Sequence, residues 1–278
     1  MPVTQSELNA FHKRLNSLIQ GAFHLDDRIA KQINSLAIDM RMRIQNHILS
    51  VAEPRSTRIG ASETIRLGQL VKMEVERFRI EATALMNRGW QDSANIGIKS
   101  TEEIANLLGQ LRPAIPGITP EIAAIATGYS ASLIQDISNE VLTQINGVLT
   151  RGLFGELTPY EAMKQIDTAM NWQGKTIPGG VSVKAERIVR TELTRARNAS
   201  AHEGHIELQK QLDPELQPLL KKTWHSAHAI NTRDTHLQAE AEYGEVGIPV
   251  DEPYMVGGFP MMFPGDSSMG APPGETIN

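Results

Sequence analysis

Cysteine is absent from this chain of 278 residues. The protein can therefore form neither disulfides nor thiolate metal sites, and a cysteine nucleophile is excluded. Aromatic residues are also scarce, at 5%, whereas methionine occurs 11 times. This composition favours helices that pack through aliphatic side chains over an all-β sandwich.

The chain also lacks long apolar runs and a strong charge of either sign. No run approaches the roughly 20 apolar residues of a membrane-spanning helix, and the N-terminal residues lack the basic-then-apolar pattern of a signal peptide. The formal net charge of −5 gives no general attraction to nucleic acid or to an anionic membrane. We therefore expect no membrane partner, and a nucleic-acid contact would need a local basic patch.

What the first half does contain is apolar residues at helical spacing. Thr4 and Glu7 form a capping-box pattern, in which each side chain bonds the other's backbone N–H, and Ser100 and Glu103 form a second one. A Pro-rich stretch at 111–120 interrupts the pattern. The apolar spacing predicts five successive helices, over about residues 4–18, 29–53, 62–89, 100–112 and 129–152.

The second half begins with helices and ends in a stretch rich in Gly and Pro. Thr158 and Glu161 predict a helix start with Pro159 at its first position, and this helix should reach Trp172. After a loop at 173–181, a long helix should run from Ser182 to Leu212. Further on we expect a strand within 219–225, a short helix over 232–243 and short strands in the irregular tail. The fold class is therefore α+β: a long-helical region, 1–154, followed by a small mixed domain, 155–278.

A histidine cluster is the first candidate for chemistry. His225, His228 and His236 lie close in sequence with Asp234, and such a set can form a general base or a zinc site. The alternative is that these side chains cap turns and bridge backbone groups. Neither a GxSxG elbow nor a GxxxxGK[ST] phosphate loop is present. We favour the structural interpretation and predict no catalytic residue, cofactor or small-molecule substrate.

His202 and His205 form a second pair, three residues apart on the predicted long helix. Metalloproteases need two histidines four residues apart, but a spacing of three can still place both imidazoles on one face of a helix. No third ligand is evident in the sequence. We therefore predict no metal site.

The long helix is also biased toward basic residues, which could contact phosphates. Glu186 and Glu192 are interleaved with them, so a salt-bridged face is the favoured interpretation. The tail beyond Thr232 is acidic, which suggests that helix and tail pack against each other. The basic residues are Lys184, Arg187, Arg190, Arg195 and Arg197.

Residues 150–278 carry an ordered set of short motifs. Arg190, Glu192 and Asn198 lie on the long helix, and Trp224 lies on the predicted strand. The later motif residues are Arg233, His236, Asp266, Gly270 and Glu275. In order and spacing this set resembles the phage Mu F-like minor head protein family, also called head morphogenesis proteins.

The resemblance implies a minor capsid protein of a tailed bacteriophage. Such a protein associates with the portal protein during assembly in the host cytoplasm and stays inside the head of the virion. The major capsid protein and packaged DNA are possible further partners. The resemblance implies no enzyme, and the motif residues then act as a folding signature. Two alternatives stay open: a nuclease or transferase that uses the histidine cluster with Asp234, and a DNA-binding packaging factor that uses the basic helix.

Overall fold

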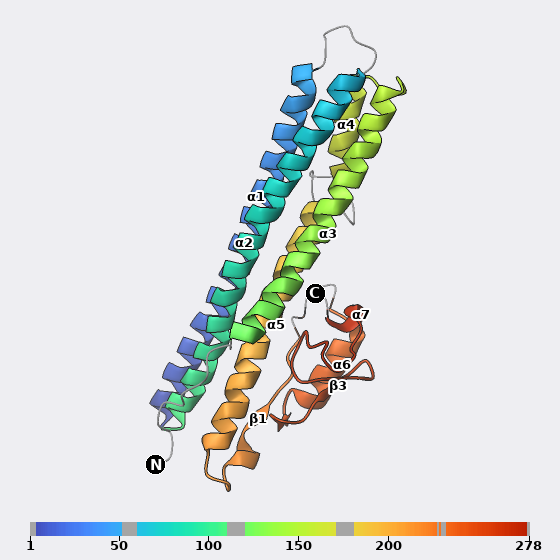
Figure 1. The fold of residues 1–278 in the computed structure, drawn as a ribbon. Coiled ribbons are helices and arrows are strands. Elements are labelled where there is room, and N and C mark those ends of the chain that lie inside the picture. Colours follow the sequence, from blue (N-terminus) through green and yellow to red (C-terminus); the bar gives the residue numbers. More distant parts are fainter. Residues whose placement is uncertain are drawn as a thin grey trace. The chain divides into compact units, whose positions relative to one another are not determined.

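The computed structural model describes residues 4–51, 60–109, 120–170, 181–226, 228 and 232–276. These residues are mostly helical, with a few short antiparallel strands in the C-terminal part (Figure 1). The first five helices are α1 (Gln5–Val51), α2 (Ala61–Leu107), α3 (Pro120–Leu153), α4 (Pro159–Met170) and α5 (Val181–Gln211). They are followed by η1 (Gln217–Leu219), β1 (Lys221–Lys222), α6 (Asp234–Tyr243), β2 (Ile248–Pro249), β3 (Tyr254–Val256), β4 (Phe259–Met261) and α7 (Pro273–Thr276). The predicted combination of long helices with a mixed C-terminal segment is confirmed at this level.

Both predicted capping boxes that begin at threonine are present. The Thr4 backbone N–H donates to Glu7 Oε2 at 2.8 Å, and the Glu7 N–H donates to Thr4 Oγ1 at 3.3 Å. The same pair of bonds joins Thr158 and Glu161, at 2.8 and 3.2 Å. Each box satisfies two N–H groups that a helix start otherwise leaves without partners.

The predicted helix end near Gly89 and the predicted start at Ser100 are wrong, because α2 runs through both positions. Buried side chains continue at helical steps across the predicted break, at Trp90, Ala94, Thr101 and Ala105. A glycine within a helix costs only about 1 kcal/mol, which burial of such side chains outweighs. The two runs predicted at 4–18 and 29–53 likewise form one helix, α1. Residues 111–119 of the predicted Pro-rich break, and Trp172, lie outside the described residues.

The chain divides into two compact units that do not follow chain order. One unit comprises residues 1–26, 89–126 and 190–278, and the other comprises 27–88 and 127–189. We call them the motif unit and the bundle unit, respectively, since all the family-motif residues fall in the first. The domain division predicted between residues 154 and 155 stays a prediction.

The bundle unit is held by aliphatic stripes and a few ion pairs. Fully buried residues recur at steps of three to four along its parts of α1, α2 and α3; examples are Ile33, Ala37, Met40, Ile44, Val71, Phe78, Ile134 and Ile145. Arg43 Nε lies 2.5 Å from Glu74 Oε2, and Lys184 Nζ lies 2.6 Å from Glu140 Oε2. No helix within the described ranges is long and apolar enough to cross a membrane.

The C-terminal part of the motif unit contains two small antiparallel ladders. β1 pairs with β2, with Lys222 opposite Ile248, and β3 pairs with β4, with Val256 opposite Phe259. Gly257 and Gly258 form the β3–β4 turn at φ values of 59° and 85°, which favour glycine. The strand predicted within 219–225 covers only Lys221–Lys222, since the residues around Pro218 form η1 instead. A core of Trp224, Ala239, Tyr243, Tyr254, Val256, Met261 and Ala271 joins these elements to α6.

Substitution of Trp224 by Ala should destabilise the protein by about 3–5 kcal/mol, because this 1% exposed side chain leaves a large cavity. Urea unfolding of the full chain, followed by circular dichroism, measures the change. Leu219→Ala is the control, since Leu219 is 71% exposed and should change stability little. An unchanged midpoint for Trp224→Ala would show that the indole does not hold this core together.

Candidate functional site

The motif residues on α5 hold a turn of the C-terminal segment. Glu192 is 2% exposed, and its Oε1 accepts a hydrogen bond of 2.7 Å from Arg195 Nη1. Arg195 Nε also donates to the Gly265 carbonyl at 2.9 Å, and Asn198 Nδ2 donates to the Pro264 carbonyl at 3.0 Å. Arg195 therefore joins the buried carboxylate on its own helix to a backbone carbonyl 70 residues away. Arg195 is not one of the motif residues identified from the sequence.

Asp266 shapes the turn that α5 holds. Its side chain is buried, and it accepts hydrogen bonds from the N–H groups of Met262, at 2.9 Å, and Ser268, at 2.8 Å. Gly265 and Gly270 have φ values of 90° and 88°, which residues with a Cβ rarely adopt. The acidic tail thus packs on the basic helix through its backbone carbonyls, while Asp266 bonds within the tail.

Another motif residue, His236, packs against the ring of Trp224. The centroid of the Trp224 ring lies 5.5 Å from that of His236, edge to face, and 5.2 Å from that of Tyr254. His236 Nε2 lies 3.2 Å from the Glu275 carbonyl oxygen, and Thr235 Oγ1 donates to Glu275 Oε2 at 2.8 Å. These contacts join α6 to α7. Of the other two motif residues, Arg190 lies on α5 and Arg233 is the N-cap residue of α6.

The predicted histidine cluster divides into two places. His225 Nδ1 and His228 Nε2 lie 3.5 Å and 2.9 Å from the carboxylate of Glu240, whereas His236 lies against Trp224. Ser226 Oγ also donates to Glu240. Its hydrogen bond, with those of His228, lowers the pKa of Glu240 to about 2. Glu240 itself is not among the residues predicted from the sequence, because it lies on α6, more than ten residues from His225 and His228.

This arrangement is not that of an activated nucleophile. In a Ser-His-acid triad the imidazole lies between the hydroxyl and the carboxylate, whereas here the carboxylate lies between Ser226 and His228. Both His225 and His228 are 67% exposed at the side chain. His228 has φ 48°, in the left-handed region, which is uncommon for a residue with a Cβ.

Asp234, the acidic residue of the predicted cluster, is the first residue of α6. Among the described residues, no group of three His, Asp or Glu side chains could hold a metal ion.

Several basic side chains of α5 have acidic partners. Arg195 bonds Glu192, Arg197 Nη1 lies 3.5 Å from Asp26 Oδ1, and Lys184 pairs with Glu140. Arg197 also donates to Ser93 Oγ at 3.2 Å. These contacts favour the salt-bridged interpretation of the basic helix over a phosphate-binding one.

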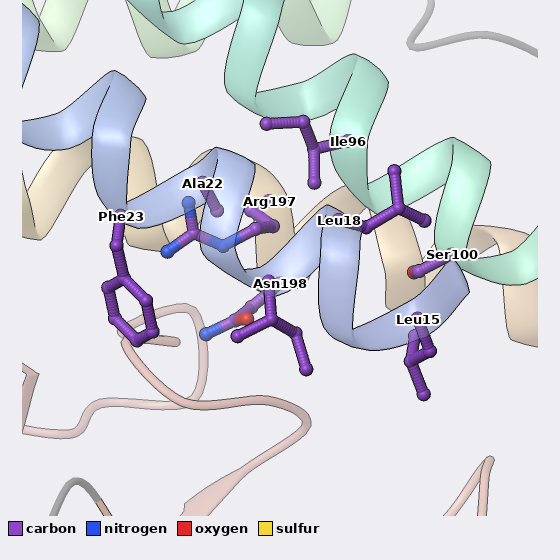
Figure 2. Close-up of a pocket in the computed structure, with 9 residues that line it drawn as sticks. Leu15, Leu18, Ala22, Phe23, Ile96, Ser100, Arg197 and Asn198 are labelled. Carbon is purple, nitrogen blue, oxygen red and sulfur yellow. The ribbon is translucent and has the colours of Figure 1, made fainter. Parts of the chain in front are cut away.

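A largely apolar cavity of about 230 Å³ lies among α1, α2 and α5 of the motif unit. Figure 2 shows Arg197 and Asn198 near its centre, with Phe23 and Leu15 toward its two ends. Its other lining residues are Leu18, Ile19, Ala22, Ile96 and Ser100. The one charged group, the Arg197 guanidinium, already contacts Asp26 and Ser93. This cavity therefore offers apolar contact rather than chemistry.

A smaller polar cavity of about 110 Å³ lies between α5 and the C-terminal segment. It brings His202 and His205 of α5 together with Lys222 of β1 and Tyr254 of β3. Lys222 Nζ donates to the Met262 carbonyl at 2.8 Å and lies 4.9 Å from the Tyr254 ring centroid. Burial lowers the pKa of both His202 and His205 to about 4, and that of Lys222 to about 8. The spacing of the two histidines was the only sequence signal for this site.

No protein-family model, curated protein or solved structure matches the chain.

Replacing Arg195 by Leu should destabilise the protein by about 3–5 kcal/mol, because the buried Glu192 carboxylate loses a cationic partner. Urea unfolding measures the change. Arg77→Leu is a matched control: Arg77 pairs with Glu81 one helical turn away, is 58% exposed, and should cost less than about 1 kcal/mol. Equal effects of the two changes would mean that Arg195 does not stabilise the motif.

Acid should destabilise the protein through the buried histidines. An imidazole with a pKa of about 4 in the folded state and about 6.5 when unfolded binds its proton preferentially in the unfolded chain. Its contribution is complete above about pH 6.5 and is lost as pH falls toward 4, on the order of 3 kcal/mol per fully shifted group. Unfolding free energies measured from pH 7 to 4 should therefore decline, and less steeply in His202→Gln/His205→Gln. His12→Gln, at an exposed position, should keep the wild-type slope.

Proposed function

We propose that this protein is a minor head (head morphogenesis) protein of a tailed bacteriophage, which docks on the portal and the capsid interior during assembly. It enters the head from the host cytoplasm and stays there, near the major capsid protein and packaged DNA. Residues 155–278 are the Mu F-like stretch, and helices within residues 1–154 supply the docking surface. The protein works by assembly rather than by catalysis.

The observation that carries this proposal is an apolar stripe on the surface of α2. Ile65, Met73 and Ile80 are 66%, 66% and 55% exposed, and all three belong to the bundle unit. Their separations of eight and seven residues place them on one face of the helix. On α1, Met42 and Leu49 are also exposed, at 44% and 54%, and lie seven residues apart. Helix faces of this kind commonly receive an amphipathic helix of a partner.

The environment of the motif residues gives further support. Glu192, Asn198 and Asp266 bond Arg195 and backbone groups of the same unit, and Trp224 is buried. Side chains used in this way stabilise a fold and are not available for a substrate. This stabilising role agrees with the role in folding that the family resemblance implies for the motif residues.

Two observations speak against the alternatives. The enzyme alternative needs the histidines to act together, but His236 lies apart from His225 and His228, and neither cavity described above is lined by any of them. The packaging-factor alternative needs basic side chains that can reach DNA, but Arg195, Arg197 and Lys184 already pair with acids.

Changing Ile65, Met73 and Ile80 together to Ser should reduce incorporation into heads by roughly tenfold or more, since each exposed anchor in a helix groove contributes about 1 kcal/mol or more. Incorporation is measured by quantitative mass spectrometry of purified procapsids. Circular dichroism melting should be almost unchanged, because these side chains contribute little to the core. The variant leaves α1 unchanged, because the buried residues of α1 form part of the core of the bundle unit.

The control is Gln69→Ser/Lys72→Ser/Glu76→Ser, three exposed polar positions on the same helix with no net charge change. It should enter heads normally. Normal incorporation of the apolar-stripe variant would show that this face of α2 is not the docking surface. If His225→Ala/His228→Ala instead enters heads normally but yields non-infectious particles that lack a hydrolase activity, the enzyme alternative replaces the proposal.

A further inference from the structure

The small polar cavity beside α5 holds an unusual set of groups for a site with no assigned role. His202 is only 9% exposed, and Lys222 reaches the same cavity from β1. His205 Nε2 is buried and has no hydrogen-bond partner among the described residues. A buried nitrogen without a hydrogen-bond partner destabilises the folded protein. The cavity therefore contains polar groups that a ligand would satisfy better than the protein does.

The electrostatics of the cavity indicate the sign of that ligand. Asp251, Glu252 and Asp266 act to raise the pKa of Lys222, yet burial outweighs them and the pKa falls to about 8. The charged amine is thus incompletely compensated where it lies. The amine donates a hydrogen bond to the Met262 carbonyl, and an ammonium has three N–H donors. A negatively charged ligand would compensate the amine, whereas a cation would be repelled by it.

The size of the cavity limits the ligand to a small group. Its volume of about 110 Å³ corresponds to roughly three to four waters at ~30 Å³ each. A tetrahedral oxyanion fits this space. Among the residues that the structure describes, no group of three His, Asp or Glu side chains is placed to hold a metal ion, so the two imidazoles do not form a metal site.

We propose that this cavity is a binding site for a tetrahedral oxyanion, with Lys222 as the cationic contact and His202 and His205 as neutral N–H donors. The ligand is a phosphate or sulfate group, either as a free ion or as part of a larger molecule such as a nucleic acid. This site is independent of the docking surface on α2, and the proposal does not rest on the protein's function in phage heads.

The anion also changes the protonation of the site. Its charge acts on His202, His205 and Lys222 in the same direction as the nearby carboxylates of Asp251, Glu252 and Asp266, which repel the anion itself. Negative charge favours the protonated forms of the imidazoles and the amine, so binding raises their pKa values and takes up protons. Affinity for sulfate, whose own charge is constant near neutral pH, therefore increases as pH falls.

The first experiment is calorimetric titration of the full chain with sodium sulfate, against sodium chloride at matched ionic strength. Lys222→Met should weaken sulfate binding by roughly tenfold or more, the loss expected for a charge-assisted hydrogen bond. The neighbouring Lys221→Met is the control, because Lys221 is exposed and does not line the cavity. Equal affinities of wild type and Lys222→Met, or no sulfate binding by the wild type, would overturn the proposal.

The second experiment uses the unmodified protein, so that it does not depend on the folding of a variant. NMR titration of the imidazole carbons of His202 and His205 should show pKa values that rise in sulfate. Unchanged titrations overturn the proposal. A short DNA duplex that binds and is displaced by sulfate identifies a nucleic-acid phosphate as the source, while binding of inorganic phosphate alone identifies a free ion; both results support the site.

Discussion

The close approach of α2 and α5 within the motif unit is the constraint on which its other contacts depend. A Cβ atom at Gly97 would lie 2.2 Å from the Arg197 carbonyl oxygen, and one at Gly204 would lie 2.6 Å from Thr101 Oγ1. Only glycine allows the two backbones to come so near. The hydroxyls of Ser93 and Thr101 then donate to carbonyl oxygens of α5, at 2.6 and 3.3 Å. With α5 fixed in this way, its polar side chains can hold the C-terminal segment.

The buried polar residues and the exposed apolar residues of this protein contribute differently to its fold. Buried polar residues such as Glu192 and Asp266 are fully used by the fold. The exposed apolar side chains, in contrast, contribute little to it and remain accessible to a partner. Substitutions among the exposed apolar side chains can therefore change the surface without altering the contacts of the buried polar residues.

Local features could be predicted from the sequence, and features that depend on tertiary contacts could not. The helix starts at Thr4 and Thr158 follow from capping boxes complete within four residues. Ser100 has the same local pattern, but burial on both sides of it keeps α2 continuous. His225 and His236 are near in sequence but contact different elements, since His225 lies against Glu240 of α6 and His236 against Glu275 of α7. The small polar cavity could not be predicted from the sequence, because tertiary packing and not sequence spacing brings α5 and β1 together.

The chain passes between the two compact units at residues 26–27, 88–89, 126–127 and 189–190, and each passage lies inside a helix. The motif-bearing stretch from residue 150 onward therefore does not encode a complete unit, since residues 1–26 and 89–126 belong to it as well. Recombination between related genes that exchanged only this stretch would place a foreign α5 against the resident α1 and α2. Such an exchange would succeed only where the resident α2 had a glycine at the position that faces Arg197 of the incoming α5, so the two halves of the gene are expected to evolve as one inherited block.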